Sequence, residues 1–359
     1  MEFKRISLKV AERCYRQKKY QEALLILDQY QKRFPHSIKA KCMRVLCYYK
    51  MDDTDAWFPL LEKIIEEHPR SSQVWFTCGY ISLKEKDYEG AINEFTRSLR
   101  LGQHHFSVYY YRGCAFYKND EDRKSIEDIS KAIDLDPNSS KAFCARGKSY
   151  SILGEHDLAI MDFNKAILLD LNCDLNFYHR GCAFEKSGLL ENAIQDFTES
   201  IRLNPYYKKA FGQRGLVLMQ QDQINKAILD FSIVSHIDPN DDKAYNNRGV
   251  AYLIKGDLNL ALLDFNQSIY LNGRDLNSLK NRALVYYKIK KYYEAYNDVY
   301  SAIKIDPGDG DCYWLFAAIY RKEGDHYQAS KYYDYAWEMY DKRNQEPPIW
   351  LMRECPLDD

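Results

Sequence analysis

The sequence predicts an all-α protein, a solenoid of ten helix-turn-helix repeats of 34 residues each. Three sets of residues predict this class, because each recurs at separations of 34 residues or a multiple of 34. The prolines are Pro35, Pro69, Pro137, Pro205, Pro239 and Pro307. The glycines are Gly79, Gly113, Gly147, Gly181, Gly215 and Gly249, and the phenylalanines are Phe95, Phe163, Phe197, Phe231 and Phe265. A period of this length is typical of repeat architectures.

Ten repeats fit the chain without an insertion. They start at Lys4, Ile38, Ser72, Phe106, Ser140, Asp174, Lys208, Asp242, Leu276 and Gly310. The last repeat ends at Arg343, so residues 4–343 are predicted to form a single solenoid, followed by a tail at residues 344–359.

Each repeat is predicted to hold two helices. In a repeat numbered 1 to 34, positions 4, 8 and 11 form one helical stripe of apolar or small residues, and positions 20, 24 and 27 form a second. Small residues at 8 and 20 let the two helices approach closely, and proline at 32 ends the second helix. One hairpin cannot bury its apolar face alone, so the repeats must stack. The first two repeats fit least well; Trp57, for example, stands at a position for a small residue.

The register and its residue types resemble the tetratricopeptide repeat family. The family pattern asks for a bulky residue at position 4, small residues at 8, 20 and 27, aromatic residues at 11 and 24, and often proline at 32. The resemblance covers residues 4–343. It implies a right-handed superhelix that binds other proteins. It also implies a concave groove lined by the first helices, mainly at positions 2, 5, 6, 9, 12 and 13.

Charged residues recur beside both core stripes. Position 7 holds Arg112, Arg146, Arg180, Arg214, Arg248 and Arg282, and position 23 holds Asp128, Asp162, Asp196, Asp230, Asp264 and Asp298. The two positions lie at similar heights on antiparallel helices, which favours an ion pair within each hairpin. The alternative joins the aspartate of one repeat to the arginine of the next. Matched pairs neutralise each other, so we interpret them as structural rather than as a phosphate-binding or metal-binding row.

Three groups of residues fall at the groove positions. The aromatic group is Phe76, Tyr80, Tyr110, Tyr117 and Tyr178, which are either anchors for a partner's peptide or helix, or packing between repeats. The basic group at position 13 is Arg16, Lys50, Lys84, Lys118, Lys186, Lys288 and Lys322, which either complement helix dipoles or form a lip for acidic ligands or RNA. The third group is Asn246, Asn247 and Asn281, which match two steps of the asparagine ladder that holds a peptide backbone in some family members.

Chaperone-binding members of the family grip a C-terminal carboxylate with lysine at position 5 and asparagine at position 9 of one repeat. Lys280 is the one lysine at position 5, and Leu284 stands where asparagine is required. This kind of chaperone binding is therefore disfavoured.

The chain shows no catalytic motif, and the eight histidines do not cluster at ligand spacing. No metal or cofactor is expected, and the protein is predicted not to be an enzyme. Ten cysteines lack a C-x-x-C pair, which indicates a reducing compartment. Four of them, at positions 5 and 9, are interpreted as core-edge residues rather than reactive thiols: Cys42, Cys114, Cys144 and Cys182.

The formal net charge of −1 argues against a general nucleic-acid partner. The charged N-terminal stretch lacks the apolar segment of a secretory signal, and no apolar run is long enough for a membrane span. We therefore expect a cytoplasmic protein, with the nucleus or a cilium as alternatives.

The tail carries four apolar residues, Ile349, Trp350, Leu351 and Met352, which are predicted to cover the exposed end of the last repeat. The alternative is a docking site for a partner or for another copy of the chain. The predicted function is a non-catalytic scaffold or adaptor whose groove binds a peptide or helix of a partner protein. The alternatives are binding of RNA or an acidic ligand at the basic lip, and a regulatory subunit of an enzyme complex.

Overall fold

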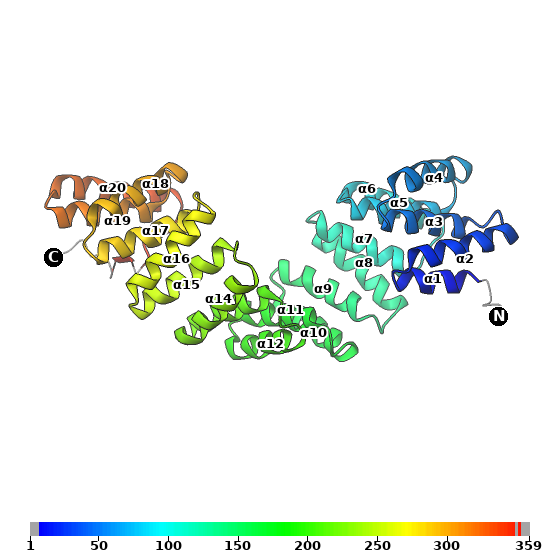
Figure 1. Cartoon of the computed structure of the whole chain (residues 1–359), viewed down its shortest axis with the longest axis horizontal. Coiled ribbons are helices and arrows are strands. Elements are labelled where there is room, and N and C mark those ends of the chain that lie inside the picture. Colours follow the sequence, from blue (N-terminus) through cyan, green and yellow to red (C-terminus); the bar gives the residue numbers. More distant parts are fainter. Residues whose placement is uncertain (1–6, 349–350, 353–359) are drawn as a thin grey trace. The chain divides into compact units, whose positions relative to one another are not determined.

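The structure is a computed structural model that describes residues 7–348 and 351–352 (Figure 1). Within these residues the chain forms helices joined by short turns and no strand, which confirms the all-α prediction. The chain divides into two compact units, Met1–Asn172 (unit 1) and Cys173–Asp359 (unit 2). Ile349 and Trp350, two of the apolar tail residues, lie outside the described residues.

Unit 1 consists of five successive helix pairs. They are α1 Leu8–Arg16 with α2 Tyr20–Arg33, α3 Ile38–Lys50 with α4 Thr54–Glu67, α5 Ser72–Lys84 with α6 Tyr88–Arg100, α7 Phe106–Lys118 with α8 Asp122–Leu135, and α9 Ser140–Ile152 with α10 His156–Leu169.

Unit 2 consists of five further pairs. They are α11 Asp174–Lys186 with α12 Leu190–Leu203, α13 Lys208–Gln220 with α14 Ile224–Ile237, α15 Asp242–Lys255 with α16 Leu258–Leu271, α17 Leu276–Lys288 with α18 Tyr292–Ile305, and α19 Gly310–Glu323 with α20 His326–Lys342. From α3 to α19, every first helix begins at the residue where the 34-residue register starts a repeat.

The turn inside each hairpin has one conformation throughout the chain. Position 15 has a positive φ of 58 to 88° in all ten repeats, at Lys18, Asp52, Lys86, Asp120, Gly154, Gly188, Asp222, Gly256, Lys290 and Gly324. A left-handed residue ends a helix by turning the chain sharply, and glycine adopts this conformation without the penalty of a Cβ atom. Lysine and aspartate at the other turns show that stacking of the hairpins outweighs a local cost of about 1 kcal/mol.

Glycine at position 8 allows the two helices of a hairpin to touch. A Cβ atom built on Gly181 would lie 2.8 Å from the ring of Phe197 on the partner helix. The same contact recurs at 2.7 Å between Gly249 and Phe265, and both phenylalanines are fully buried. The paired recurrence of glycine and phenylalanine in the sequence is therefore one close-packing contact repeated along the chain.

Successive first helices lie beside one another within each unit. In unit 1, α3 contacts α5, α5 contacts α7, and α7 contacts α9. In unit 2, the same relation runs along α11, α13, α15, α17 and α19. Successive second helices have no comparable contacts in the described part of the chain. Each unit therefore curves with its first helices on the inner side, whereas the superhelical path of all ten repeats together stays a prediction.

The last two repeats share the largest apolar cluster of unit 2. Trp314, Leu315 and Phe316 of α19 are buried in it together with Tyr340 of α20. Leu351 of the tail is also fully buried in this cluster. No described helix of either unit is both long and apolar enough to cross a membrane.

Candidate protein-binding face

Each of the six hairpins from α7/α8 to α17/α18 is closed by a bidentate ion pair between an arginine and an aspartate. In the first of these, Arg112 donates from Nε to Asp128 Oδ2 at 2.6 Å and from Nη2 to Oδ1 at 2.8 Å. The five other predicted pairs have the same geometry, with these N–O distances between 2.6 and 2.8 Å. The aspartates are between 2 and 6% exposed, so each carboxylate depends on its guanidinium for compensation.

The remaining guanidinium nitrogen reaches the preceding repeat. Nη1 of Arg112 donates to Thr96 Oγ1 at 3.0 Å, and Nη1 of Arg146 donates to Ser130 Oγ at 3.0 Å. Arg282 donates in the same way to Asn266 Oδ1 at 2.7 Å. The acceptor stands at position 25 each time and is neutral. One arginine thus holds its own hairpin through an ion pair and the previous hairpin through a hydrogen bond to a neutral acceptor.

Arg44 of the second repeat pairs differently. Position 23 of its own repeat is Leu60, so no carboxylate is available inside the hairpin. The guanidinium instead forms an ion pair with Asp28 at position 25 of the first repeat and donates to Gln31 Oε1 at 2.9 Å. Pairing through position 25 was not among the predicted alternatives, although Asp28 stands where the third to eighth repeats carry Ser, Thr or Asn.

Two residues of the predicted aromatic patch pack between helices. The Phe76 ring lies 5.8 Å from that of Phe95 on α6, centroid to centroid, and Tyr110 packs against Ile129 of α8 and Ala142 of α9. Both side chains are partly buried against the apolar clusters of unit 1. These contacts support the packing interpretation for Phe76 and Tyr110.

Tyr80 and Tyr117 have a different environment, because ammonium groups lie over their rings. Lys50 Nζ and Lys84 Nζ lie 5.5 and 5.4 Å from the centroid of the Tyr80 ring. Lys118 Nζ and Lys148 Nζ lie 5.4 and 4.6 Å from that of Tyr117. Such distances are typical of cation–π contacts, which attract a cation to a ring without neutralising its charge.

A third ring, that of Tyr49, completes the surface, with Lys50 Nζ at 5.3 Å from its centroid. We call this surface the lysine–tyrosine face. It comprises Tyr49, Lys50, Tyr80, Lys84, Tyr117, Lys118 and Lys148, all on the first helices α3, α5, α7 and α9. Lys148 was missed in the sequence because it stands at position 9, outside the basic row at position 13, although position 9 is one of the groove positions.

Lysines beside Tyr80 and beside Tyr117 act on one common group, the Cys114 thiol. Burial raises the pKa of the Cys114 thiol, while the nearby charges of Lys148, Lys84 and Lys118 act to lower it. The same thiol therefore lies within reach of lysines beside both rings. The pKa of Lys50 is lowered by burial and by the charge of Lys84.

No carboxylate of the described residues forms an ion pair with the four lysines of the face. The nearest acidic neighbour in sequence, Glu85, accepts a hydrogen bond from the Tyr49 hydroxyl at 2.6 Å. Lys50, Lys84 and Lys118 are the last residues of their helices, where a cation complements the helix dipole. Lys148 lies inside α9, so the dipole does not explain its place.

Three cysteines of the first helices, two in unit 1 and one in unit 2, are not poised for reaction. Burial raises the pKa of Cys42 to about 11, and it raises that of Cys78 and Cys182 to about 12. A thiol in that range is almost entirely protonated at neutral pH and is a poor nucleophile. Among the described residues, no group of three or more His, Cys, Asp or Glu side chains is placed to hold a metal ion.

Comparison with protein families identifies the repeats. A sequence model of the tetratricopeptide repeat matches residues 140–173, 176–207 and 242–275, and a second model of this repeat matches residues 8–37. These matches fall in both units and follow the register of the helix pairs. The matched segments are therefore tetratricopeptide repeats.

Solved structures of other tetratricopeptide repeat proteins share the fold. The C-terminal part of a protein from Cytophaga hutchinsonii is 21% identical, covers 66% of this chain and 97% of its own, and superposes with a TM-score of 0.55. A protein from Parabacteroides merdae is 18% identical, covers 70% of this chain and 98% of its own, and has a TM-score of 0.54.

A third structure, the APC/C hetero-tetramer Cut9–Hcn1, covers 94% of this chain and 66% of the matched one at 16% identity, with a TM-score of 0.53. At these identities the likeness shows the fold. Comparison with curated proteins gave no match.

Several groove residues of unit 2 form polar contacts within the chain. Asn281 Nδ2 donates to Asn246 Oδ1 at 3.0 Å, and Ser278 Oγ donates to the same oxygen at 3.2 Å. Asn247, the remaining member of the predicted ladder, is partly exposed beside them. Two of the three asparagines thus bond to each other.

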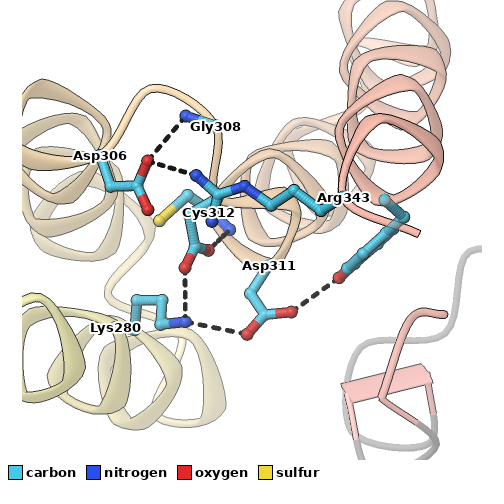
Figure 2. Close-up of polar contacts among 8 residues, drawn as sticks. Lys280, Asp306, Gly308, Asp311, Cys312 and Arg343 are labelled. Atoms are coloured by element: carbon cyan, nitrogen blue, oxygen red, sulfur yellow. Dashed lines mark hydrogen bonds and ion pairs between the residues drawn. The ribbon is translucent and has the colours of Figure 1, made fainter. Parts of the chain in front are cut away.

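Lys280, the lysine at position 5, is held by two carboxylates, one in the turn just before α19 and one at the start of α19 (Figure 2). Its Nζ lies 2.9 Å from both Asp309 Oδ2 and Asp311 Oδ2. Burial acts to lower the pKa of Lys280, but the two carboxylates outweigh it and the pKa lies above its ordinary value. Tyr340 of α20 donates to Asp311 at 2.7 Å, so the network joins α17, α19 and α20.

A second bridge secures the same end of α20. Arg343 Nη2 lies 2.7 Å from Asp306 Oδ1, which also accepts from the backbone N–H of Gly308 (Figure 2). Lys280 is therefore a structural cation, and the predicted absence of a chaperone-type carboxylate grip stays a prediction.

The last predicted groove residues lie at the first repeat of unit 2. The Tyr178 ring packs 5.9 Å from Phe197 and 5.0 Å from Tyr207, and Lys186 is exposed at the end of α11. Tyr178 thus belongs with the packing aromatics, whereas Lys186 is a solvated helix-end cation.

Proposed function

We propose that this tetratricopeptide repeat protein is a non-catalytic scaffold whose lysine–tyrosine face binds a peptide or helix of a partner protein. One observation carries the proposal: partly exposed aromatic rings gather beside lysines on the inner side of unit 1. Tyr49, Tyr80 and Tyr117 come from three successive repeats and are each only partly buried. Aromatic rings held rigidly at a surface are effective anchors for a protein ligand, because they bury much area at little cost in conformational entropy.

The geometry favours this face over the equivalent positions of unit 2. Rings of both units pack on other rings, Tyr178 on Tyr207 and Tyr80 on Tyr111. In unit 2, however, the polar groups at positions 5 and 6 of the eighth and ninth repeats also bond to one another, and Lys280 is held by two carboxylates. A partner binding there would have to replace contacts that already exist. On the lysine–tyrosine face, a partner would not have to break an ion pair of the lysines.

A capture experiment tests the proposal. The full chain, immobilised, is compared with a variant carrying Lys84→Glu and Lys118→Glu, using cell extract treated with nuclease. The matched control carries Lys131→Glu and Lys165→Glu, exposed lysines on the second helices α8 and α10 with the same change in charge. We expect a defined set of proteins that the wild type and the control retain and the face variant loses.

Two results of this experiment would overturn the proposed function. Retention by the face variant of everything that the wild type retains would remove the face as the binding surface. Loss of all captured protein on nuclease treatment would show that nucleic acid, not protein, occupies it.

A further inference from the structure

We propose that the lysine–tyrosine face recognises an acidic, extended protein segment, whose carboxylates pair with the ammonium groups above the tyrosine rings. This inference deepens the proposed function and rests on it, since it names the chemistry of the partner at the same face. Three features of the face support it: lysines without a carboxylate, rings that restrict those lysines, and the lack of a bare ring for a base to stack on.

The first feature is the charge. Four lysines from four successive repeats lie on one side of unit 1, and none has a carboxylate partner among the described residues. Lys50 is partly buried and is also repelled by Lys84. Elsewhere the chain neutralises such groups: Lys280 has two carboxylates at 2.9 Å. An anionic ligand would compensate the face as Asp309 and Asp311 compensate Lys280.

The second feature is the position of the charge. A lysine side chain in water samples many rotamers, and the entropy lost in fixing it opposes an ion pair at a surface. Here the rings of Tyr80 and Tyr117 each attract two ammonium groups, which restricts where the charges lie before any ligand arrives. Charges restricted in this way lose less entropy on pairing.

The repeat also sets the direction of the row. The four lysines belong to α3, α5, α7 and α9, so successive charges are carried by successive first helices. A segment that crosses these helices in extended form would meet one repeat after another. A helical ligand would present its carboxylates along one stripe and meet fewer of them.

The third feature separates protein from RNA. Proteins that bind single-stranded nucleic acid use aromatic rings as free platforms on which bases stack. The rings of Tyr80 and Tyr117 carry lysine ammonium groups instead, so a base would have to displace a cation before stacking. Carboxylates require no such displacement.

The test uses the purified full chain and a fluorescein-labelled peptide of glutamates alternating with leucines, followed by fluorescence anisotropy. We expect binding that weakens as salt rises, and no binding of the same peptide with lysine in place of glutamate. Lys84→Glu with Lys118→Glu should weaken binding by about tenfold or more, because two attractions become repulsions. The control Lys131→Glu with Lys165→Glu should change it by less than about twofold.

The ring contribution is tested at Tyr117. Tyr117→Phe keeps a ring beneath Lys118 and Lys148 and should bind as the wild type does, whereas Tyr117→Ala should weaken binding by about threefold. Circular dichroism and the melting temperature report whether either variant is misfolded.

The inference is overturned if the acidic peptide does not bind at low salt, if both charge-reversal variants lose binding equally, or if labelled poly(U) binds more tightly than the peptide. Its failure is distinguishable from that of the proposed function. If the face captures proteins but the acidic peptide does not bind, only the inferred preference for acidic segments is refuted. If the acidic peptide binds but capture of proteins does not depend on the face, the proposed scaffold function is refuted.

Discussion

The two units share one kind of interior and differ on their first-helix surfaces. Arg112 and Asp128 in unit 1 form the same two-pronged pair as Arg214 and Asp230 in unit 2. At the groove positions, however, the four lysines of the lysine–tyrosine face lie over rings without a carboxylate partner, whereas Lys280 of unit 2 is held by two carboxylates. The difference teaches that positions 7, 8, 23 and 24 maintain the hairpin, while positions 5, 9, 12 and 13 are free to diverge toward internal stability or toward external binding.

The largest expected effect concerns the shared interior. Asp128→Ala and Asp230→Ala should each lower the free energy of unfolding by ~3–5 kcal/mol, because each leaves a partly buried guanidinium without its partner. Urea unfolding followed by circular dichroism measures both. Adding Arg112→Ala to the first variant, or Arg214→Ala to the second, should cost much less than the single changes predict by addition. Strict additivity, or a loss confined to one unit, would contradict a common interior.

A somewhat smaller effect separates the two surfaces directly. Lys280→Ala should destabilise the chain by about 3 kcal/mol, because two partly buried carboxylates lose their counter-charge. Lys84→Ala, the matched change in unit 1, should stay within about 0.5 kcal/mol. Thermal unfolding of the two variants provides the measurement. Equal losses would show that the lysine–tyrosine face is as structural as the Lys280 network.

The next effect concerns the end of unit 2. Leu351→Ala should lower the free energy of unfolding by about 2 kcal/mol if the tail covers the last repeat, as we propose, because Leu351 fills space in the α17–α20 cluster. Met352→Ala is the control, since Met352 is 41% exposed. Equal stability of Leu351→Ala and wild type would remove the capping role of the tail.

The smallest expected effect concerns the irregular second repeat. Arg44→Ala should cost under about 1 kcal/mol, because its partner Asp28 has a side chain that is 47% exposed and the ion pair is screened by solvent. Arg112→Ala is the comparison, with a partner side chain that is 3% exposed. A cost for Arg44→Ala equal to that for Arg112→Ala would show that pairing across repeats stabilises as well as pairing within them.

Sequence periodicity predicted the helix pairs because interior packing recurs with the register. Gly181 and Phe197 illustrate this: each was recognisable by spacing, and the structure shows that the glycine makes room for the ring. The environment of each groove side chain was harder to predict from spacing. Phe76 and Tyr80 stand four residues apart on one helix and both pack on the ring of Tyr111, yet only Tyr80 also lies beneath two lysines.

Contacts between repeats were the hardest to predict. Asp309 and Asp311 reach Lys280 from about 30 residues away, from the turn and start of the next repeat. Asp28 reaches Arg44 in the opposite direction along the chain. A repeat pattern describes what all repeats share, so contacts made once are invisible to it.

Nη1 of the arginines at position 7 points back to the preceding hairpin, so the bonds between stacked hairpins have one direction along the chain. Arg146 depends on Ser130 of the repeat before it, whereas Arg112 of that earlier repeat donates to Thr96, one repeat further back. Loss of a preceding hairpin would strand a cationic nitrogen, while loss of a following hairpin strands only a neutral hydroxyl that water can satisfy. Within each unit, hairpins should therefore be lost more readily from the C-terminal side than from the N-terminal side.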